Sequence, residues 1–494
     1  MVPLMCCDSL CLLIAAAVCY FAWWLWSTRQ GDLPPGPRGL PFVGYLPFLS
    51  RNGEVQLAEI SKKYGNVTRF TIGSVQFVLL GDYKAVVEAF VNQKTTFIGR
   101  PKSNLFKVKE TDRGVCITDG EVWRQMRKFT LICFKEFDIG NTLMEPRILN
   151  EIGHFLNELT NFRGKSVDPS NWLGISIANI FSVFEFGRRF EYSDPVFINL
   201  VKLTDDAMTH FSSIALRALF PWTYNIPFLD SVTGESRMVH IRNEVEKFMC
   251  KKIKEHQKSQ DGTMNDFIDA FLKKRQENIE TTGSEVVSLE ANLWILFIAG
   301  SKTTVTTLLW AILYMALYPK VQKKVQDEID DVVGMQRAPS STDKLPYTEA
   351  TLLEIQRCGS VVPLNLEHRN SEEANLFGYK IPKDSRVISN LWAIHHDPKL
   401  WNDPHKFMPE RFLNAKGEVE KPEYFIPFSI GKHICIGENM AKLELFLYLT
   451  SILQRFDIKP SANELSTKSV SGITRCPTPY TVSFGTRQGY QVSH

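Results

Sequence analysis

Apolar residues recur at helical spacing along most of the chain, and strand-like alternation is confined to short pieces. The pattern predicts an amphipathic helix over Glu54–Tyr64. The longest helical segment runs from Ser288 to Leu317 and is apolar on almost every side, which is typical of a helix buried all round. Another helix is expected from Pro346, because proline is favoured at the first helical position, and a last apolar helix over Gly437–Arg455.

Strand-like pieces are few. Residues Val67–Ile72 and Val75–Leu80 alternate around Gly73 and predict a β-hairpin. Further pieces lie around Ser385–Ile388 and after Thr474. Helices outnumber strands, so the predicted fold class is mainly α with small β-sheets to one side (α+β), in a single large helical body.

The N-terminal residues 9–26, SLCLLIAAAVCYFAWWLW, contain no charge and are just long enough to cross a bilayer. Trp23, Trp24 and Trp26 suit a membrane interface. A cleaved signal peptide is the alternative, but the apolar run is long and its aromatic end lacks a small-residue cleavage site. We therefore expect a transmembrane anchor within residues 1–30.

The charges around this span give its orientation. Asp8 precedes it and Arg29 follows it, a weak bias that leaves the body on the cytoplasmic side. The following stretch LPPGPRGLP, residues 33–41, is rich in proline, which prevents a continuous helix from membrane to body. We expect a proline-rich linker over 31–45 and a catalytic domain over 46–494.

Composition excludes some classes of protein. The 494 residues are 44% hydrophobic and carry a net charge of only +3, which gives no indication of nucleic-acid binding. The ten cysteines are scattered or lie in the N-terminal segment, with no Cys-x-x-Cys pair. This usage argues for a reducing compartment and against a zinc or disulfide scaffold.

The centre of the long apolar segment is unusual. Residues 296–310, LFIAGSKTTVTTLLW, hold a glycine, a lysine and four threonines. Glycine costs about 1 kcal/mol in a helix interior, and threonine hydroxyls compete for backbone carbonyls. Such a weak, polar centre in a buried helix needs a functional reason.

Cys435 has a setting suited to a metal ligand. It stands between Gly431 and Gly437, just before the last predicted helix. Glycines let a flat ligand approach the backbone closely, and the helix N-terminus favours a thiolate. One cysteine without partner ligands does not suit zinc, but it suits haem iron, whose macrocycle supplies four nitrogens.

The sequence around Cys435, PFSIGKHICIGENMA at 427–441, resembles the haem-binding signature of the cytochrome P450 superfamily. Other motifs of that family occur in order: Trp123–Arg127, Ala299–Thr304, Leu353–Arg357 and Pro409–Phe412. The resemblance extends from the anchor to the end of the chain and is greatest to animal microsomal enzymes, as NLWAIHHDP at 390–398 suggests.

The resemblance implies haem b (iron protoporphyrin IX) with Cys435 as the axial ligand of iron. Phe428 belongs to the same cofactor-binding signature. Residues that would contact the haem propionates are Arg100, Trp123, Arg127, His368 and His433. Histidine at 433 replaces the arginine of many members and would bind propionate more weakly and with a pH dependence. Glu354, Arg357 and Arg411 would form a structural ion-pair network behind the cysteine.

The resemblance also gives the long helix a function. Gly300 would leave room for dioxygen, and Thr303 would hydrogen-bond oxygen and order water for proton delivery. Lys302 departs from the family, which has an acid there, and a lysine cation accepts no hydrogen bond. Three interpretations follow: Lys302 points to solvent while Thr303 and water deliver protons, the enzyme rearranges peroxides, or it binds haem without efficient turnover.

Apolar residues dominate the expected substrate pocket, so a lipophilic small molecule is predicted. By family position, the lining residues are Phe297, Ile298, Ala299, Val361, Val362 and Leu366, with parts of 105–115 and 471–473.

No dinucleotide-binding unit is present in the sequence, so electrons would come from NADPH through a separate reductase. Arg124, Lys128 and Lys432 form a possible docking face for it, with a generic solvated face as the alternative.

The expected protein is a monooxygenase of the endoplasmic reticulum membrane that uses O2. A hydroperoxide isomerase or dehydratase and a haem-bearing ligand or gas sensor remain open. Substrate identity and oligomeric state are beyond this sequence.

Overall fold

The computed structural model describes residues 31–50, 52–73, 75–101, 114–137, 144–220, 234–258, 264–276, 289–461 and 465–488, with Val18, Gly140, Thr223 and Ile226. The chain divides into two compact units, residues 1–101 with 367–390 and residues 102–366 with 391–494. The expected anchor within residues 1–30 and the pocket segment 105–113 lie outside the described residues.

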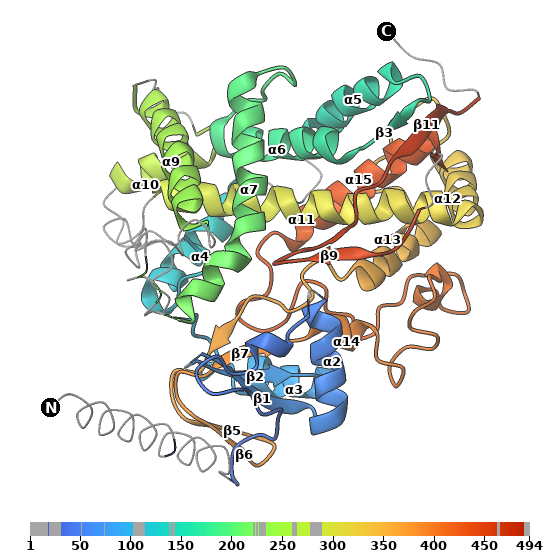
Figure 1. The fold of residues 1–494 in the computed structure, drawn as a ribbon. Coiled ribbons are helices and arrows are strands. Elements are labelled where there is room, and N and C mark those ends of the chain that lie inside the picture. Colours follow the sequence, from blue (N-terminus) through green and yellow to red (C-terminus); the bar gives the residue numbers. More distant parts are fainter. Residues whose placement is uncertain are drawn as a thin grey trace, which may run out of the picture. The chain divides into compact units, whose positions relative to one another are not determined.

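The first unit is built around a four-stranded sheet of order β1-β2-β7-β4 (Figure 1). β1 and β2 form an antiparallel hairpin at Gly73, whose φ of +58° favours glycine. β7 joins β2 in parallel, and β5 pairs with β6 as a separate hairpin. The elements are η1 (Leu46–Phe48), α2 (Gly53–Tyr64), β1 (Val67–Ile72), β2 (Val75–Leu80), α3 (Tyr83–Val87), η2 (Glu88–Asn92), β4 (His368–Arg369), β5 (Ala374–Leu376), β6 (Tyr379–Ile381) and β7 (Arg386–Ser389).

The second unit is mainly helical. Its helices are α4 (Gly120–Glu136), α5 (Glu145–Asn161), α6 (Ser170–Phe186), α7 (Pro195–Ala218), α9 (Glu235–Lys258), α10 (Phe267–Gln276), α11 (Leu289–Leu317), α12 (Pro319–Val332), α13 (Pro346–Gly359), α14 (Leu391–His395), η7 (Pro409–Phe412) and α15 (Glu438–Arg455). Two small sheets have the orders β3-β11-β8 and β10-β9. Their strands are β3 (Ser166–Val167), β8 (Phe456–Pro460), β9 (Ser469–Ser471), β10 (Arg475–Pro477) and β11 (Val482–Thr486).

Helix α11 is the core of the second unit. It packs along α6 and against α9, α13 and α15, and Figure 1 shows it running through this unit. Within the described parts of the chain it is the one helix long and apolar enough to cross a membrane, yet 67% of its most apolar stretch is buried in protein. Its all-round hydrophobicity is therefore explained by neighbours on every side.

The predicted elements are confirmed with small shifts at their ends. The helix expected over Glu54–Tyr64 is α2, and the long apolar segment is α11. Pro346 is the first residue of α13, as its restricted φ favours. The expected strand at Ser385–Ile388 is β7, which runs from Arg386 to Ser389. The expectation of small sheets in a mainly helical protein agrees with the described residues.

Candidate active site

The loop before α15 presents Cys435 in a tightly turned backbone. Ser429 and Gly431 adopt positive φ values of 63° and 83°, in the left-handed region that tight turns use. The Cys435 N–H then donates to the Phe428 carbonyl at 3.0 Å, and the Ile434 N–H donates to Gly431 at 3.2 Å. The loop closes on itself and fixes the thiol three residues before Glu438, where α15 begins.

Cys435 is exposed, although protein atoms are packed around most of the thiol. That burial raises the pKa of the Cys435 thiol, while a hydrogen bond from the Gly437 N–H and the nearby Arg127 cation lower it. A Cβ built on Gly437 would meet no other described atom within 4 Å. The site therefore has an accessible sulfur beside open space. The Gly437 N–H and the Arg127 cation favour the thiolate, which is the form that binds a metal.

Helix α4 supplies the cation and the indole next to this loop. Arg127 Nη2 donates to the Ile434 carbonyl at 2.7 Å, which ties α4 to the cysteine loop. The Trp123 ring lies 4.3 Å from the His433 ring, and the Arg127 guanidinium lies 5.9 Å from the Trp123 ring. The structure thus brings together three predicted propionate contacts, Trp123, Arg127 and His433.

Trp123 also provides a test of fit for haem. Its indole Nε1–H is buried and has no hydrogen-bond acceptor among the described residues. A buried donor without a partner costs about 1–3 kcal/mol, so an acceptor is expected there when the protein works. A carboxylate such as a haem propionate satisfies that requirement, and the residues around Cys435 fit the cofactor.

Arg100 and His368 belong to the first unit and are both buried. Arg100 Nη1 donates to the Glu367 carbonyl at 2.9 Å. His368 Nδ1 lies 2.8 Å from the Phe97 carbonyl, and its ring stacks on Phe90 at 4.0 Å. These protein contacts hold both side chains in place, and their haem role stays a prediction.

The centre of α11 carries hydroxyls that bond to their own helix. Thr303 Oγ1 donates to the Ala299 carbonyl at 2.7 Å, and Thr307 Oγ1 to the Thr303 carbonyl at 2.8 Å. Ser301 and Thr306 bond to carbonyls four residues back in the same way. Each hydroxyl group therefore has a hydrogen-bond acceptor within its own helix, which allows a polar stretch inside a buried helix. Ala299 and Thr303 keep accessible surface.

Lys302 does not simply point to solvent, as one interpretation of the sequence had it. Its Nζ lies 2.6 Å from Asp205 Oδ1 on α7, and its side chain is only 22% exposed. The pairing satisfies a partly buried cation, so an unpaired lysine in the core is avoided. Nothing in the sequence indicated Asp205, because it is 97 positions away.

The expected role of Gly300 beside dioxygen stays a prediction, and the structure adds a packing role for this residue. We expected its missing side chain to leave room for dioxygen. A Cβ built there would lie 1.9 Å from Phe181 Cζ on α6. Gly300 therefore permits the close approach of α6 to α11, and it keeps some accessible surface, as Ala299 and Thr303 do.

A buried acid that the sequence analysis missed lies behind the same turn. Thr304 Oγ1 donates to Glu444 Oε2 on α15 at 3.0 Å. Glu444 is fully buried, and this burial raises its pKa to about 8. Its other oxygen, Oε1, has no partner among the described residues. The signal in the sequence was one glutamate inside the apolar run LELFLYL.

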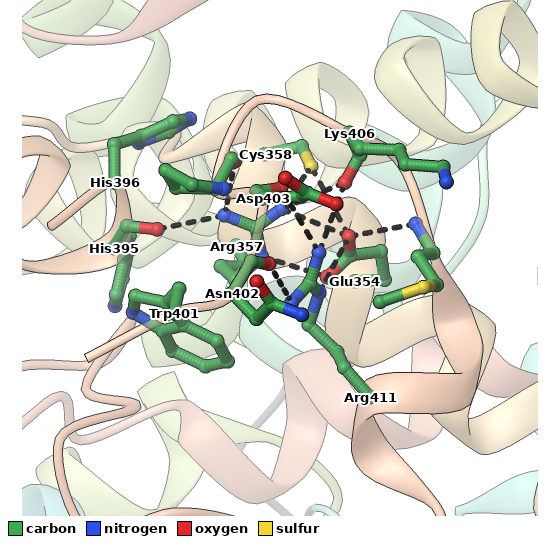
Figure 2. Close-up of polar contacts among 12 residues, drawn as sticks. Glu354, Arg357, Cys358, His395, His396, Trp401, Asn402, Asp403, Lys406 and Arg411 are labelled. Atoms are coloured by element: carbon green, nitrogen blue, oxygen red, sulfur yellow. Dashed lines mark hydrogen bonds and ion pairs between the residues drawn. The ribbon is translucent and has the colours of Figure 1, made fainter. Parts of the chain in front are cut away.

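The predicted ion-pair network is present in full. Glu354 accepts from Arg357 Nε at 2.7 Å and Nη2 at 2.8 Å, and from Arg411 Nε at 3.1 Å. Figure 2 shows how Arg357 also reaches the His395 carbonyl, at 2.7 Å. Arg411 donates to the Asn402 carbonyl at 2.7 Å. Fully paired in this way, the buried charges fasten α13 to η7 and to the chain segment that precedes it.

The expected pocket residues have different environments. Phe297 is completely enclosed, so we correct its assignment from pocket lining to helix core. Ile298 is also buried, with 8% exposed. Ala299 is exposed, and Val361, Val362 and Leu366 are partly exposed on one loop of the second unit. The Val361 carbonyl of that loop accepts from the Arg475 N–H at 2.8 Å.

Comparison with known proteins decides the family. A family model described as Cytochrome P450 matches residues 34–484. The chain belongs to the cytochrome P450 family. It is similar to "Cytochrome P450 2U1" of Homo sapiens, 36% identical over 96% of this chain and 93% of that protein. It is also similar to "Cytochrome P450 2H2" of Gallus gallus, 36% identical over 96% of this chain and 98% of the relative.

Family membership makes this P450 a haem-dependent monooxygenase, and its relatives named above are animal P450 2 enzymes. The relationship covers both units, and the motifs quoted from the sequence lie inside the matched region. The geometry adds what the family does not specify for this chain: Lys302 pairs with Asp205, and Glu444 lies behind Thr304.

Proposed function

We propose that this P450 inserts one atom of O2 into a lipophilic small molecule, with electrons passed from NADPH through a separate reductase. The observation that best supports this proposal is the accessible Cys435 thiol, which a hydrogen-bonded loop holds in place. The buried indole N–H of Trp123, which has no acceptor among the described residues, belongs to the helix bonded to that loop. That combination suits one axial sulfur ligand and one propionate acceptor of the same haem.

When bound, haem supplies the activation of dioxygen, with a thiolate pushing electron density toward it. The chain's own residues hold and orient the cofactor. Cys435 would ligate iron, and the Gly437 N–H, which donates to its sulfur, partly offsets the rise that burial causes in the pKa of this thiol. Trp123, Arg127 and His433 would bind propionate, and the family resemblance adds Arg100, His368 and Phe428.

Thr303 is the proposed proton-handling group on α11. Its hydroxyl donates to Ala299, so its oxygen retains lone pairs that can accept from water. The helix turn around it has accessible surface, whereas Thr304 is turned into the protein toward Glu444. Thr303 therefore orients water, and Thr304 fastens α11 to α15.

The substrate is proposed to be lipophilic. Apolar side chains with accessible surface are present at Ala299, Val361, Val362 and Leu366. Ile298 adds a small exposed area, since 8% of its surface is accessible. Such a lining binds mainly through apolar burial and leaves few polar groups to specify orientation. We therefore expect several apolar compounds to bind, with affinity that rises with the apolar area buried.

The reductase is proposed to dock on α4. A surface hollow of about 470 Å³ lies along this helix, lined by Trp123, Arg124, Arg127, Lys128, Leu131, Ile132 and Lys135. Leu131 is 46% exposed, and lysine and arginine surround it. An apolar centre with a cationic rim suits an acidic electron donor, and the hollow adjoins the Cys435 loop through Arg127.

The location is proposed from the sequence. The uncharged run at 9–26 favours one N-terminal span in the endoplasmic reticulum membrane, with the catalytic domain cytosolic. A lipid bilayer is then a permanent partner of the chain.

One observation favours a second function. Lys302 occupies the position where an acid would help deliver protons, and a peroxide substrate brings its own oxygen and needs no reductase. A hydroperoxide isomerase or dehydratase that uses Cys435 is therefore the alternative.

Two assays on one panel separate these functions. Lauric acid, ethoxycoumarin and testosterone are incubated with full-length protein, reductase, NADPH and O2, or with cumene hydroperoxide alone. Product that requires NADPH and reductase is the expected result. Product only from the hydroperoxide would overturn the monooxygenase proposal and establish the alternative.

A further inference from the structure

The ion pair between Lys302 and Asp205 joins two helices at the functional turn of α11. Lys302 Nζ lies 2.6 Å from Asp205 Oδ1, and Figure 1 shows α7 crossing α11. The Asp205 side chain is 54% exposed, against 22% for Lys302. The carboxylate therefore contacts water while the ammonium that holds it is largely enclosed.

The turn itself contains no group able to exchange protons with water at neutral pH. Residues 299–307 read AGSKTTVTT, without an acid or a histidine. The ammonium of Lys302 only donates, and the hydroxyls of Thr303 and Thr306 donate into the helix backbone. A carboxyl group that serves this turn must come from another helix.

Among the described residues, two carboxyl groups bond to side chains of this turn, one from α7 and one from α15. Glu444 bonds to Thr304 but is completely enclosed, so it cannot recover a proton directly from bulk water. Asp205 bonds to Lys302 and is open to solvent. A group that passes protons inward in every catalytic cycle has to be recharged from water, and among these two only Asp205 meets that condition.

We propose that Asp205, positioned by Lys302, is the carboxylate through which protons pass from solvent to the turn of α11 that carries Thr303. This inference rests on the proposed monooxygenase function. Asp205 takes one proton from solvent, becomes a neutral carboxylic acid, gives the proton to water held at the Thr303 hydroxyl, and returns to carboxylate. No electron is transferred in this step. Asp205 on α7 carries the proton and Lys302 on α11 positions Asp205, in place of one acidic residue on α11.

The test uses the full-length holoenzyme with reductase, NADPH and ethoxycoumarin. Asp205→Asn keeps an oxygen that accepts from Lys302 but cannot carry a proton. We expect about a tenfold fall in product formed per NADPH consumed, smaller than the usual general acid–base effect because water substitutes in part. Asp205→Glu should restore the coupling, because it puts a carboxylate back beside Lys302. Turnover driven by cumene hydroperoxide should remain unchanged in every variant.

The matched control is Asp206→Asn, the next acid on α7, which pairs with Arg237 on α9 instead. Amide hydrogen exchange over residues 195–208 reports whether α7 stays docked, independently of activity. The charge-swapped double variant Lys302→Glu with Asp205→Lys should retain coupling, because a carboxylate remains at the pair.

Three results would overturn the inference: unchanged coupling in Asp205→Asn, an equal loss in Asp206→Asn, or a loss that simply follows faster exchange in α7. If wild-type protein forms no NADPH-dependent product, the proposed function itself fails. That outcome is distinct from an active wild type whose Asp205→Asn variant is equally coupled.

Discussion

The carboxylate of Glu354 receives two parallel hydrogen bonds from the guanidinium of Arg357, at 2.7 and 2.8 Å, with both side chains completely buried. Burial alone would lower the pKa of Arg357, but the hydrogen bonds and charge of Glu354 raise it. The pair is stable because nearly every donor of the guanidinium also reaches a carbonyl or carboxylate. Its integrity fixes the segments that follow α13.

Glu354→Gln should therefore lower the free energy of unfolding by about 3 kcal/mol, since it leaves the buried Arg357 charge without a counter-ion. Denaturant unfolding of the purified holoenzyme measures this loss. The control is Asp327→Asn, which breaks an exposed pair with Lys323 and should cost at most about 0.5 kcal/mol. Equal effects of the two changes would contradict a special contribution of the buried network.

Glu444 should make the stability depend on pH. Its folded pKa of about 8 lies above the ordinary carboxyl value of 4.5. Between these two values the folded protein binds one more proton than the unfolded chain, so this stabilisation is complete below about pH 4.5. It is lost as pH rises toward 8, at up to about 1.4 kcal/mol per pH unit.

Thermal midpoints of wild type and Glu444→Gln, measured from pH 5 to pH 8, test this assignment. The glutamine stays neutral, so the wild-type midpoint should fall relative to the variant as pH rises. Other titrating groups are common to both proteins and cancel in the comparison. Parallel curves would show that Glu444 is already ionised in the folded protein.

Gly300→Ala should disturb the packing of α6 on α11. The new Cβ would meet the Phe181 ring at 1.9 Å, and overpacking of this kind costs about 1–3 kcal/mol. The control is Gly153→Ala on α5, where a Cβ meets nothing within 4 Å and helix propensity predicts a gain of up to about 1 kcal/mol. Recovery of stability by Phe181→Leu in the Gly300→Ala background would confirm the contact. A neutral Gly300→Ala would refute it.

Trp123→Phe separates cofactor retention from protein stability. The change removes a buried N–H that has no acceptor among the described residues, together with part of a ring that packs against His433, so the stability of the haem-free protein is measured alongside as the control. Haem should leave the holoenzyme several-fold faster, because a propionate loses a donor. Transfer of haem to an excess of apomyoglobin gives the rate. An unchanged rate would mean that the indole does not contact the cofactor.

The sequence allowed most helices to be placed, because apolar periodicity and proline positions act over short distances. α2, α11 and α15 begin and end within about two residues of their predicted bounds, and α13 begins at Pro346, as predicted. The Cys435 loop was also predictable, since its two glycines and the following helix lie within a few positions. Local rules of backbone and side-chain preference are sufficient for features of this kind.

Features that depend on contacts between distant segments were missed. The packing role of Gly300 was missed because a sequence cannot show that Phe181 lies against it. Lys302 looked unpaired because Asp205 lies on another helix. Phe297 was assigned to the pocket by family position, although the rotation of α11 turns it into the core. The role of each of these three residues depends on which neighbouring helix its position on α11 faces, and the residue type alone does not show that.

The most direct test of the whole account is the absorption spectrum of the reduced protein with carbon monoxide, before and after Cys435→Ser. The wild type should show the band typical of thiolate-ligated haem, and the variant should lose that band while Cys358→Ser keeps it. Survival of the band in Cys435→Ser would contradict the assignment of the iron ligand, and with it the proposed active site.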